Sequence, residues 1–130
     1  MTVNYLAILV AGLAGYGFGA LYYTSLSAAW LDAVGMKKEE LGTSKTPFIV
    51  AAVANIVMAA VLAGLMTHVG PITIRAGIVS AGLCWLGFVA TTIAVNNAFP
   101  GRKAKLSIID GIHWLGVLVI QGAIIGAFGA

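Results

Sequence analysis

Four stretches of the chain contain no Asp, Glu, Lys or Arg, and each is long enough to cross a lipid bilayer. These stretches are residues 1–31, 46–74, 76–101 and 111–130. A transmembrane helix needs about 20 consecutive apolar residues, and inside a bilayer only a helix or a closed barrel satisfies its own backbone hydrogen bonds. The pattern therefore predicts an all-α membrane protein with four transmembrane helices.

The four helices are expected to form a single membrane domain over residues 1–130. Their predicted limits are about 4–23, 47–67, 72–98 and 107–128. Apolar residues at helical spacing over 25–34 predict a short interfacial helix after the first span, with aromatic rings at headgroup depth from Tyr22, Tyr23 and Trp30. The first apolar run is too long for the hydrophobic region of a signal peptide, so we expect it to be retained as a span.

The composition excludes several classes of protein. Hydrophobic residues make up 61% of the chain, charged residues 8%, and the mean hydropathy is +1.03, which excludes an ordinary soluble domain. The net charge of +3 lies in short loops between apolar runs, which argues against a nucleic-acid partner. The single cysteine, Cys84, excludes an intrachain disulfide, and we interpret it as a small packing residue.

Small residues recur every four positions on two of the predicted helices. Gly15 and Gly19 continue such a row from Ala7 and Ala11, and Gly122 and Gly126 form another with Ala130. Small residues let membrane helices approach closely, so these rows are predicted to be packing faces. The contact could lie inside the bundle or between two protein subunits.

Two amide side chains, Asn55 and Gln121, lie deep inside predicted spans. An amide in a bilayer needs a hydrogen-bond partner, and interhelical bonds of this kind contribute about 0.6 kcal/mol on average. We expect both residues to join helices. Contact with a solute is the alternative.

Asp110 and His113 are three residues apart on one helical face and are the only candidates for chemistry. Ser107 and Asp110 have the spacing of a capping box, which predicts that Asp110 stabilises the start of the fourth helix. We expect His113 to be a neutral imidazole bonded to a neighbouring helix, with ligation of a haem, a chlorin or a metal as the alternative. No metal site or catalytic residue is predicted, because no second helix carries the Glu-x-x-His motif of bundle metal sites.

Two segments resemble signatures of the bacterial membrane family called domain of unknown function 1761. The first is residues 4–26, which contain Gly19-Ala20-Leu21-Tyr22-Tyr23, and the second is residues 86–92, continued by Asn96, Phe99, Gly101-Arg102 and Ile109-Asp110-Gly111. The resemblance covers nearly the whole chain and implies a small four-span protein with no established activity. The chain departs from the family pattern at Ser25, Pro100 and His113, so a cofactor on His113 would not be a property of the whole family.

The resemblance also points to Asn96, Gly101, Arg102 and Asp110 at one end of the third and fourth spans. The polar residues among them are expected to form a cluster, with His113 as a further possible member. Arg102 could pair with Asp110 across the short loop. The pair would either close the loop or form a mouth for an anionic group or lipid head.

The sequence is compatible with three functions. The leading interpretation is a non-catalytic protein of the bacterial inner membrane, in contact with membrane lipids, that acts as a homo-oligomer or as an accessory subunit of a larger membrane complex. The alternative is a small transporter or channel with its pathway at an oligomer axis. A membrane enzyme using Asp110 and His113 is the third. We predict no cofactor and no nucleic-acid partner.

The distribution of basic residues predicts the orientation in the membrane. Six of the seven lie in the loops after the first and third spans, at Lys37, Lys38, Lys45, Arg102, Lys103 and Lys105, whereas Arg75 alone lies on the other side. Short loops rich in Lys and Arg stay in the cytoplasm, so both termini are expected outside. Alkaline phosphatase fused after residue 130 should therefore be active, and fusions within residues 37–45 should be inactive. The reverse pattern would contradict the predicted orientation.

Overall fold

The computed structural model describes residues 3–129, and over this range it contains helices and connecting turns but no strand. Four helical spans are long and apolar enough to cross a membrane, which confirms the predicted all-α class. They are α1 (Tyr5–Ser25), α3 (Thr46–Val69), the continuous α4 (Ile74–Cys84), η2 (Trp85–Ala90) and α5 (Thr91–Ala98), and α6 (Ala104–Phe128). Two short helices, α2 (Ser27–Val34) and the 3-10 turn η1 (Lys38–Glu40), follow α1.

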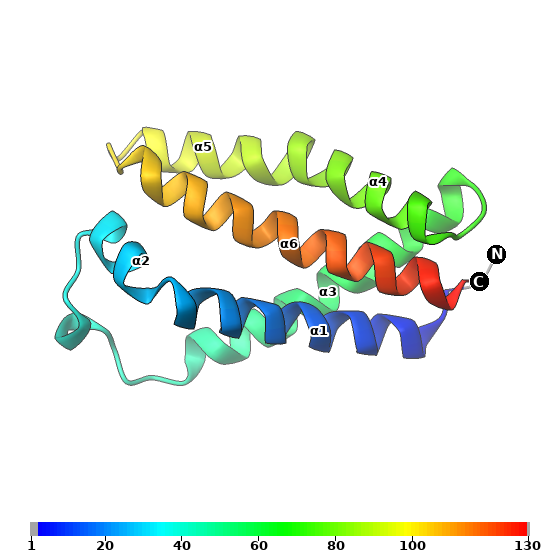
Figure 1. Ribbon diagram of the computed structural model, residues 1–130, viewed down its shortest axis with the longest axis horizontal. Helices are drawn as coiled ribbons and strands as arrows, with labels where there is room; N and C mark the ends of the chain where they lie inside the picture. Colours follow the sequence, from blue (N-terminus) through cyan, green and yellow to red (C-terminus); the bar gives the residue numbers. More distant parts are fainter. Residues whose placement is uncertain (1–2, 130) are drawn as a thin grey trace.

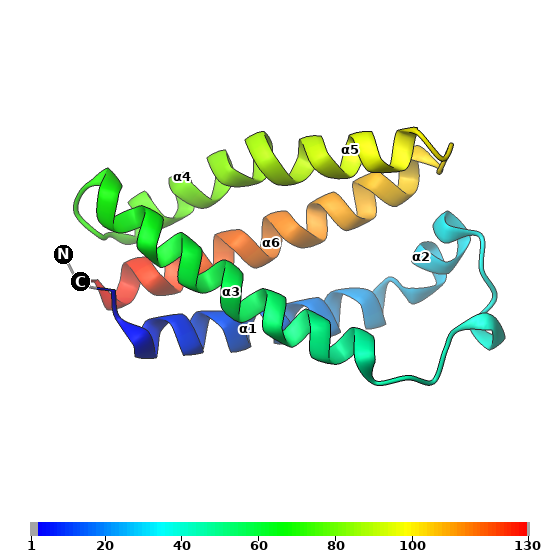
Figure 2. The same cartoon turned by 180° about the vertical axis from the view of Figure 1, so that it is seen from behind.

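The spans run side by side as an elongated bundle (Figures 1 and 2). The start of α1, the end of α6 and the α3–α4 turn lie at one end, which we call the terminal end. The other end carries α2, η1 and the α5–α6 turn, and with them six of the seven Lys and Arg residues. We call it the basic end.

Local sequence signals explain where the helices begin. The Asn4 side chain accepts a hydrogen bond from the Ala7 N–H at 3.1 Å and caps α1, and Thr73 caps α4 in the same way through the N–H of Ala76. Pro47 occupies the first turn of α3, where its missing N–H costs no intrahelical bond. Gly35, with φ of 80°, provides the left-handed residue that ends α2.

The expected start of the fourth span near Ser107 is wrong by one turn. Helix α6 begins at Ala104, so Ser107 lies inside it and forms no capping box with Asp110. The Ser107 hydroxyl instead accepts a hydrogen bond from the Asn97 amide at 3.1 Å, across the α5–α6 turn. This turn closes tightly because Gly101 adopts a φ of 72°, which lets α6 start only three residues later.

Helix α6 is the centre of the bundle, and it touches α4 at glycine residues. A Cβ added to Gly77 of α4 would overlap the backbone carbonyl of Gly122, and one added to Gly126 would overlap that of Thr73. Glycine at these positions lets the two backbones meet, which is how membrane helices gain packing energy in the absence of a hydrophobic driving force. Ala130, which belongs to the same row of small residues, lies outside the described range.

The middle of the third span widens into the π-helical segment η2. An α-helix makes one turn in about 3.6 residues, so residues four apart do not lie directly above one another on its surface. A π-helical turn contains more residues, which shifts the later side chains back round the axis. The span contacts α6 both at the first residue of η2 and beyond its end. Trp85 Nε1 donates to the Gly111 carbonyl at 2.7 Å, and Asn97 donates to Ser107, both on α6.

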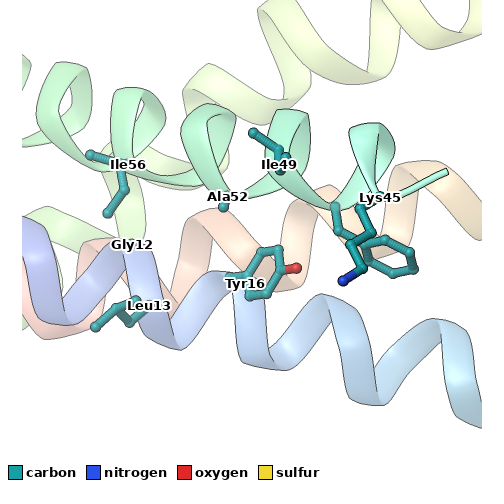
Figure 3. Close-up of a pocket in the computed structure, with 8 residues that line it drawn as sticks. Gly12, Leu13, Tyr16, Lys45, Ile49, Ala52 and Ile56 are labelled. Atoms are coloured by element: carbon teal, nitrogen blue, oxygen red, sulfur yellow. The ribbon is translucent and has the colours of Figure 1, made fainter.

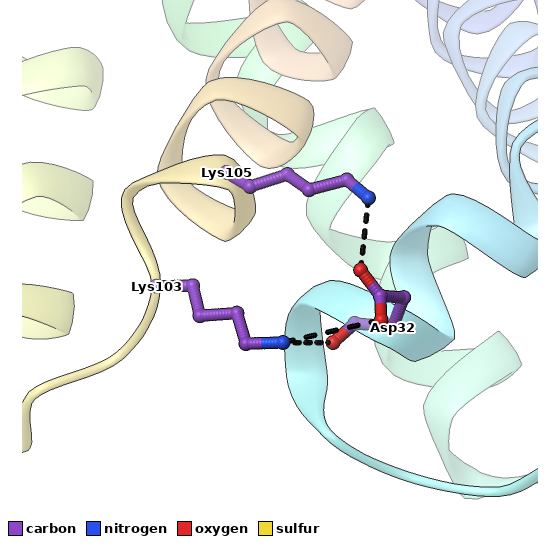
Figure 4. Close-up of polar contacts among 3 residues, drawn as sticks. All are labelled: Asp32, Lys103 and Lys105. Carbon is purple, nitrogen blue, oxygen red and sulfur yellow. Dashed lines mark hydrogen bonds and ion pairs between the residues drawn. The ribbon is translucent and has the colours of Figure 1, made fainter.

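Helix α2 folds back onto the start of α6 and is held there by apolar contacts and an ion pair. Ala33 of α2 packs with Leu106 and Ile109 of α6. The Asp32 carboxylate accepts a hydrogen bond from Lys105 Nζ at 3.0 Å, and Lys103 Nζ donates to the Asp32 backbone carbonyl at 3.1 Å (Figure 4). The Lys105 hydrogen bond, with the nearby positive charges, lowers the pKa of Asp32, so the pair is present at neutral pH and is lost in acid.

The glycine contact between α4 and α6 makes a direct prediction. Gly77→Ala should lower the free energy of unfolding by about 1–3 kcal/mol, because its methyl group has no room against the Gly122 carbonyl. Gly64→Ala on α3 is the control, since nothing lies within 4 Å of its added Cβ and alanine favours a helix. Unfolding by dodecyl sulfate in mixed micelles, followed by circular dichroism, measures both. Equal stabilities of the two variants would show that the backbones do not meet at Gly77.

Candidate functional site

His113 lies in an enclosure of aromatic rings between α1 and α6. The side chain is 5% exposed. The rings around it, at centroid distances from 4.4 to 6.2 Å, belong to Phe18, Tyr22 and Tyr23 of α1 and to the adjacent Trp114. The α1 rings lie at spacings of four and five residues, so they project from one side of the helix toward α6.

The two tyrosine hydroxyls attach α1 to the first half of α6. Tyr23 Oη donates to the Asp110 carboxylate at 2.6 Å, and Tyr22 Oη donates to the Ile109 carbonyl at 2.7 Å. A hydrogen bond to a carboxylate is shorter and stronger than one between neutral groups. Asp110 therefore links two spans, and Tyr23 connects it to the His113 ring. Their aromatic character predicts a position at headgroup depth, but nothing in their spacing indicates these two bonds.

The ring nitrogens of His113 face protein on both sides. A Cβ added to Gly19 would lie 2.8 Å from Nε2, so the α1 backbone passes close to this nitrogen. Nδ1 is buried and has no hydrogen-bond partner in the described part of the chain. The expected bond from the imidazole to a neighbouring helix is not formed at Nδ1.

The expected polar cluster does not form as one group. Its four members are Asn96, Arg102, Asp110 and His113. Asp110 is bonded to Tyr23, whereas Arg102 and Asn96 are exposed. The expected ion pair between Arg102 and Asp110 is absent from the described residues, where the ion pairs are those of Asp32 with Lys103 and Lys105. The reason is the tight α5–α6 turn, which is followed by a full turn and a half of α6 before Asp110.

The two intramembrane amides meet at the centre of the bundle. Gln121 Nε2 of α6 donates to the Asn55 backbone carbonyl of α3 at 3.1 Å and lies 3.4 Å from Asn55 Oδ1. Gly15 of α1 packs against both, because a Cβ added there would lie 2.6 Å from Asn55 Oδ1 and 2.7 Å from Gln121 Nε2. The three helices thus join at one buried polar contact. Gln121 Oε1 is buried without a partner in the described residues.

The groups of this region are arranged to hold helices together. The Asp110 carboxylate is engaged by a hydroxyl, the imidazole is enclosed, and the amides bond across helices. Within residues 3–129 no cluster of three or more His, Cys, Asp or Glu side chains is placed to hold a metal ion. The chemistry that this geometry supports is hydrogen bonding inside the membrane.

Substitutions of Asp110 test this structural role. Asp110→Asn keeps an oxygen that accepts from Tyr23, so the free energy of unfolding should fall by less than about 1 kcal/mol, whereas Asp110→Leu leaves the Tyr23 hydroxyl unpaired and should cost about 1–3 kcal/mol. Dodecyl sulfate unfolding measures both, and the cost of Asp110→Leu should shrink in a Tyr23→Phe background. A well-folded Asp110→Asn protein that had lost a transport or enzymatic activity would instead make Asp110 a functional residue.

Comparisons with known proteins place the chain in one family. No curated protein and no solved structure matches it. One family model does match, over residues 6–126, and its description is "Protein of unknown function (DUF1761)". The match extends over all four spans and agrees with the resemblance seen in the two sequence signatures. The chain therefore belongs to the DUF1761 family.

Proposed function

We propose that this multi-pass membrane protein is a non-catalytic homo-oligomer of the bacterial inner membrane, and that its subunits meet at the outer face of the third span. The observation that supports the proposal is the uneven coverage of the spans. Within the most apolar window of each span, 11% of the residues of the third span are buried, against 44% for α6. The third span is thus the one with the most surface left to cover.

The outer face of the third span carries glycines that would gain no packing energy from contact with lipid. Leu83, Leu86 and Phe88 are exposed, and the neighbouring Gly82 and Gly87 have nothing within 4 Å of an added Cβ. A glycine that faces acyl chains gives up packing without any gain, whereas a glycine that faces another helix allows close approach. A second copy of the span would use both glycines.

Polar side chains continue this face toward the basic end. Thr91, Thr92 and Asn96 are exposed. The threonine hydroxyls donate back to the carbonyls of Gly87 and Phe88, whereas the Asn96 amide is open to a partner. A facing copy would offer that partner. In a transporter or channel, the alternative function, the same side chains would line a pathway at the oligomer axis, and in an accessory subunit they would face a different membrane protein.

A non-catalytic role agrees with the state of the acidic groups and the histidine inside the bundle. Asp110 accepts a hydrogen bond from Tyr23, Asp32 is paired with lysines, and the His113 ring is enclosed by aromatic side chains. A reactive site needs groups that a substrate can reach. The basic end, with six of the seven Lys and Arg residues, favours a cytoplasmic location for α2 and the α5–α6 turn and an outside location for both termini.

Bulky substitutions at exposed glycines test the proposed interface. Gly87→Leu should weaken self-association by tenfold or more, about 1.4 kcal/mol, because the leucine would hold the two spans apart while leaving the fold of each subunit unchanged. Gly17→Leu on α1 is the matched control, since Gly17 is also exposed and has nothing within 4 Å of its added Cβ. The mass of the protein in lipid nanodiscs, measured over a range of protein-to-lipid ratios, reports the association.

Three results would change the proposal. A wild-type protein that is monomeric at every ratio would refute the homo-oligomer. Equal weakening by Gly17→Leu would place the interface elsewhere. A different membrane protein that co-purifies in fixed proportion, and is lost in Gly87→Leu, would favour the accessory subunit.

A further inference from the structure

The surface between α1 and α3 is hollowed into a groove on the half of the bundle nearest the basic end (Figure 3). Its volume is about 580 Å³, which lies in the range of small-molecule sites, and its lining includes Leu13, Tyr16, Ile49, Ala52 and Lys45. One end of the groove is closed where the two helices touch, since a Cβ added to Gly12 would overlap the Ile56 side chain. The groove thus has a closed apolar end and an open end near Lys45.

The groove is apolar along its length and polar at its open end. Leu13, Phe48, Ile49 and Ala52 form its walls, and Figure 3 shows the Tyr16 hydroxyl pointing toward the Lys45 side chain. Lys45 directly precedes α3, so it lies where the span leaves the membrane. The ion pairs of the described residues are those of Asp32, which leaves the Lys45 charge without an acidic partner.

We propose that this groove binds one acyl chain of an anionic phospholipid, with the lipid phosphate paired to Lys45. An acyl chain matches the apolar trough, and a lysine at the end of a span extends its ammonium group toward the headgroups. Anionic lipids are concentrated near the cytoplasmic surface, which is where the proposed orientation puts the basic end. The site does not depend on self-association.

Charge complementarity favours a lipid over a helix from a second copy. A facing apolar helix could fill the trough between Leu13 and Ile49, but it would leave the Lys45 ammonium group unpaired. A lipid phosphate would pair with this ammonium group and would also accept a hydrogen bond from the Tyr16 hydroxyl. The groove therefore favours a lipid whose headgroup carries a negative charge.

Binding of two lipids with identical dioleoyl chains tests the site in the full-length protein. Native mass spectrometry from detergent micelles should show phosphatidylglycerol bound about fivefold more tightly than phosphatidylcholine, the ratio expected for one lysine near a membrane surface. Lys45→Gln should remove this preference, and Lys37→Gln, in the loop away from the groove, should retain it. Equal affinities of the wild-type protein for the two lipids, or a preference that survives Lys45→Gln, would overturn the proposal.

Filling the groove tests the acyl-chain part of the site. Ala52→Trp should lower the affinity for both lipids by fivefold or more, whereas Ala60→Trp, on an exposed part of α3 outside the groove, should leave both affinities unchanged. Circular dichroism verifies that both variants fold. Equal losses in the two variants would overturn the proposal. If Ala52→Trp instead converted a dimer into a monomer in nanodiscs, a second copy rather than lipid would be the occupant.

Discussion

The direct backbone contact between α4 and α6 is the constraint on which the rest of the bundle depends. Lipid tails provide no hydrophobic force between helices, so the spans associate only as far as their surfaces fit. Gly77, Gly122 and Gly126 remove side chains where α4 and α6 meet, and the third span then follows α6 along its length. Helix α6 becomes the shared partner of the other spans, and this explains why it is the most buried of the four.

Much of this architecture could be predicted from the sequence because it depends on local patterns. Charge-free runs identify the four spans, and the spacing of small residues identifies the helix faces that pack. The signals that mark helix starts at Asn4 and Pro47 are also local. Ser107 was misleading because its pattern is that of a capping box, yet the Gly101 turn had already started α6 and the Ser107 hydroxyl bonds to Asn97 across it.

The contacts around the candidate site could not be predicted, since they join residues far apart in the sequence. Tyr23 and Asp110 are 87 positions apart, and Asp32 and Lys105 are 73 apart. Nothing in the spacing of either pair indicates which of several polar partners will meet. The small number of acidic groups was the one sequence feature that pointed to these contacts. Asp32 and Asp110 are the acids beside or inside spans, and each needs a partner at the basic end.

The two ends of the bundle are joined by different means, and this difference explains where a groove can form. At the terminal end the helices meet backbone to backbone, as at Gly126 and Thr73. Toward the basic end large side chains fill the space between α1 and α6, with Phe18 against Gly116 and His113 against Gly19. Aromatic rings separate helices more than glycines do, so α1 is held by hydroxyl bonds from Tyr22 and Tyr23 rather than by close approach. Beyond its contact at Ile56, α3 lies away from α1, and the aromatic side chains there, Tyr16 and Phe48, line a groove that runs down to Lys45 and do not fill it.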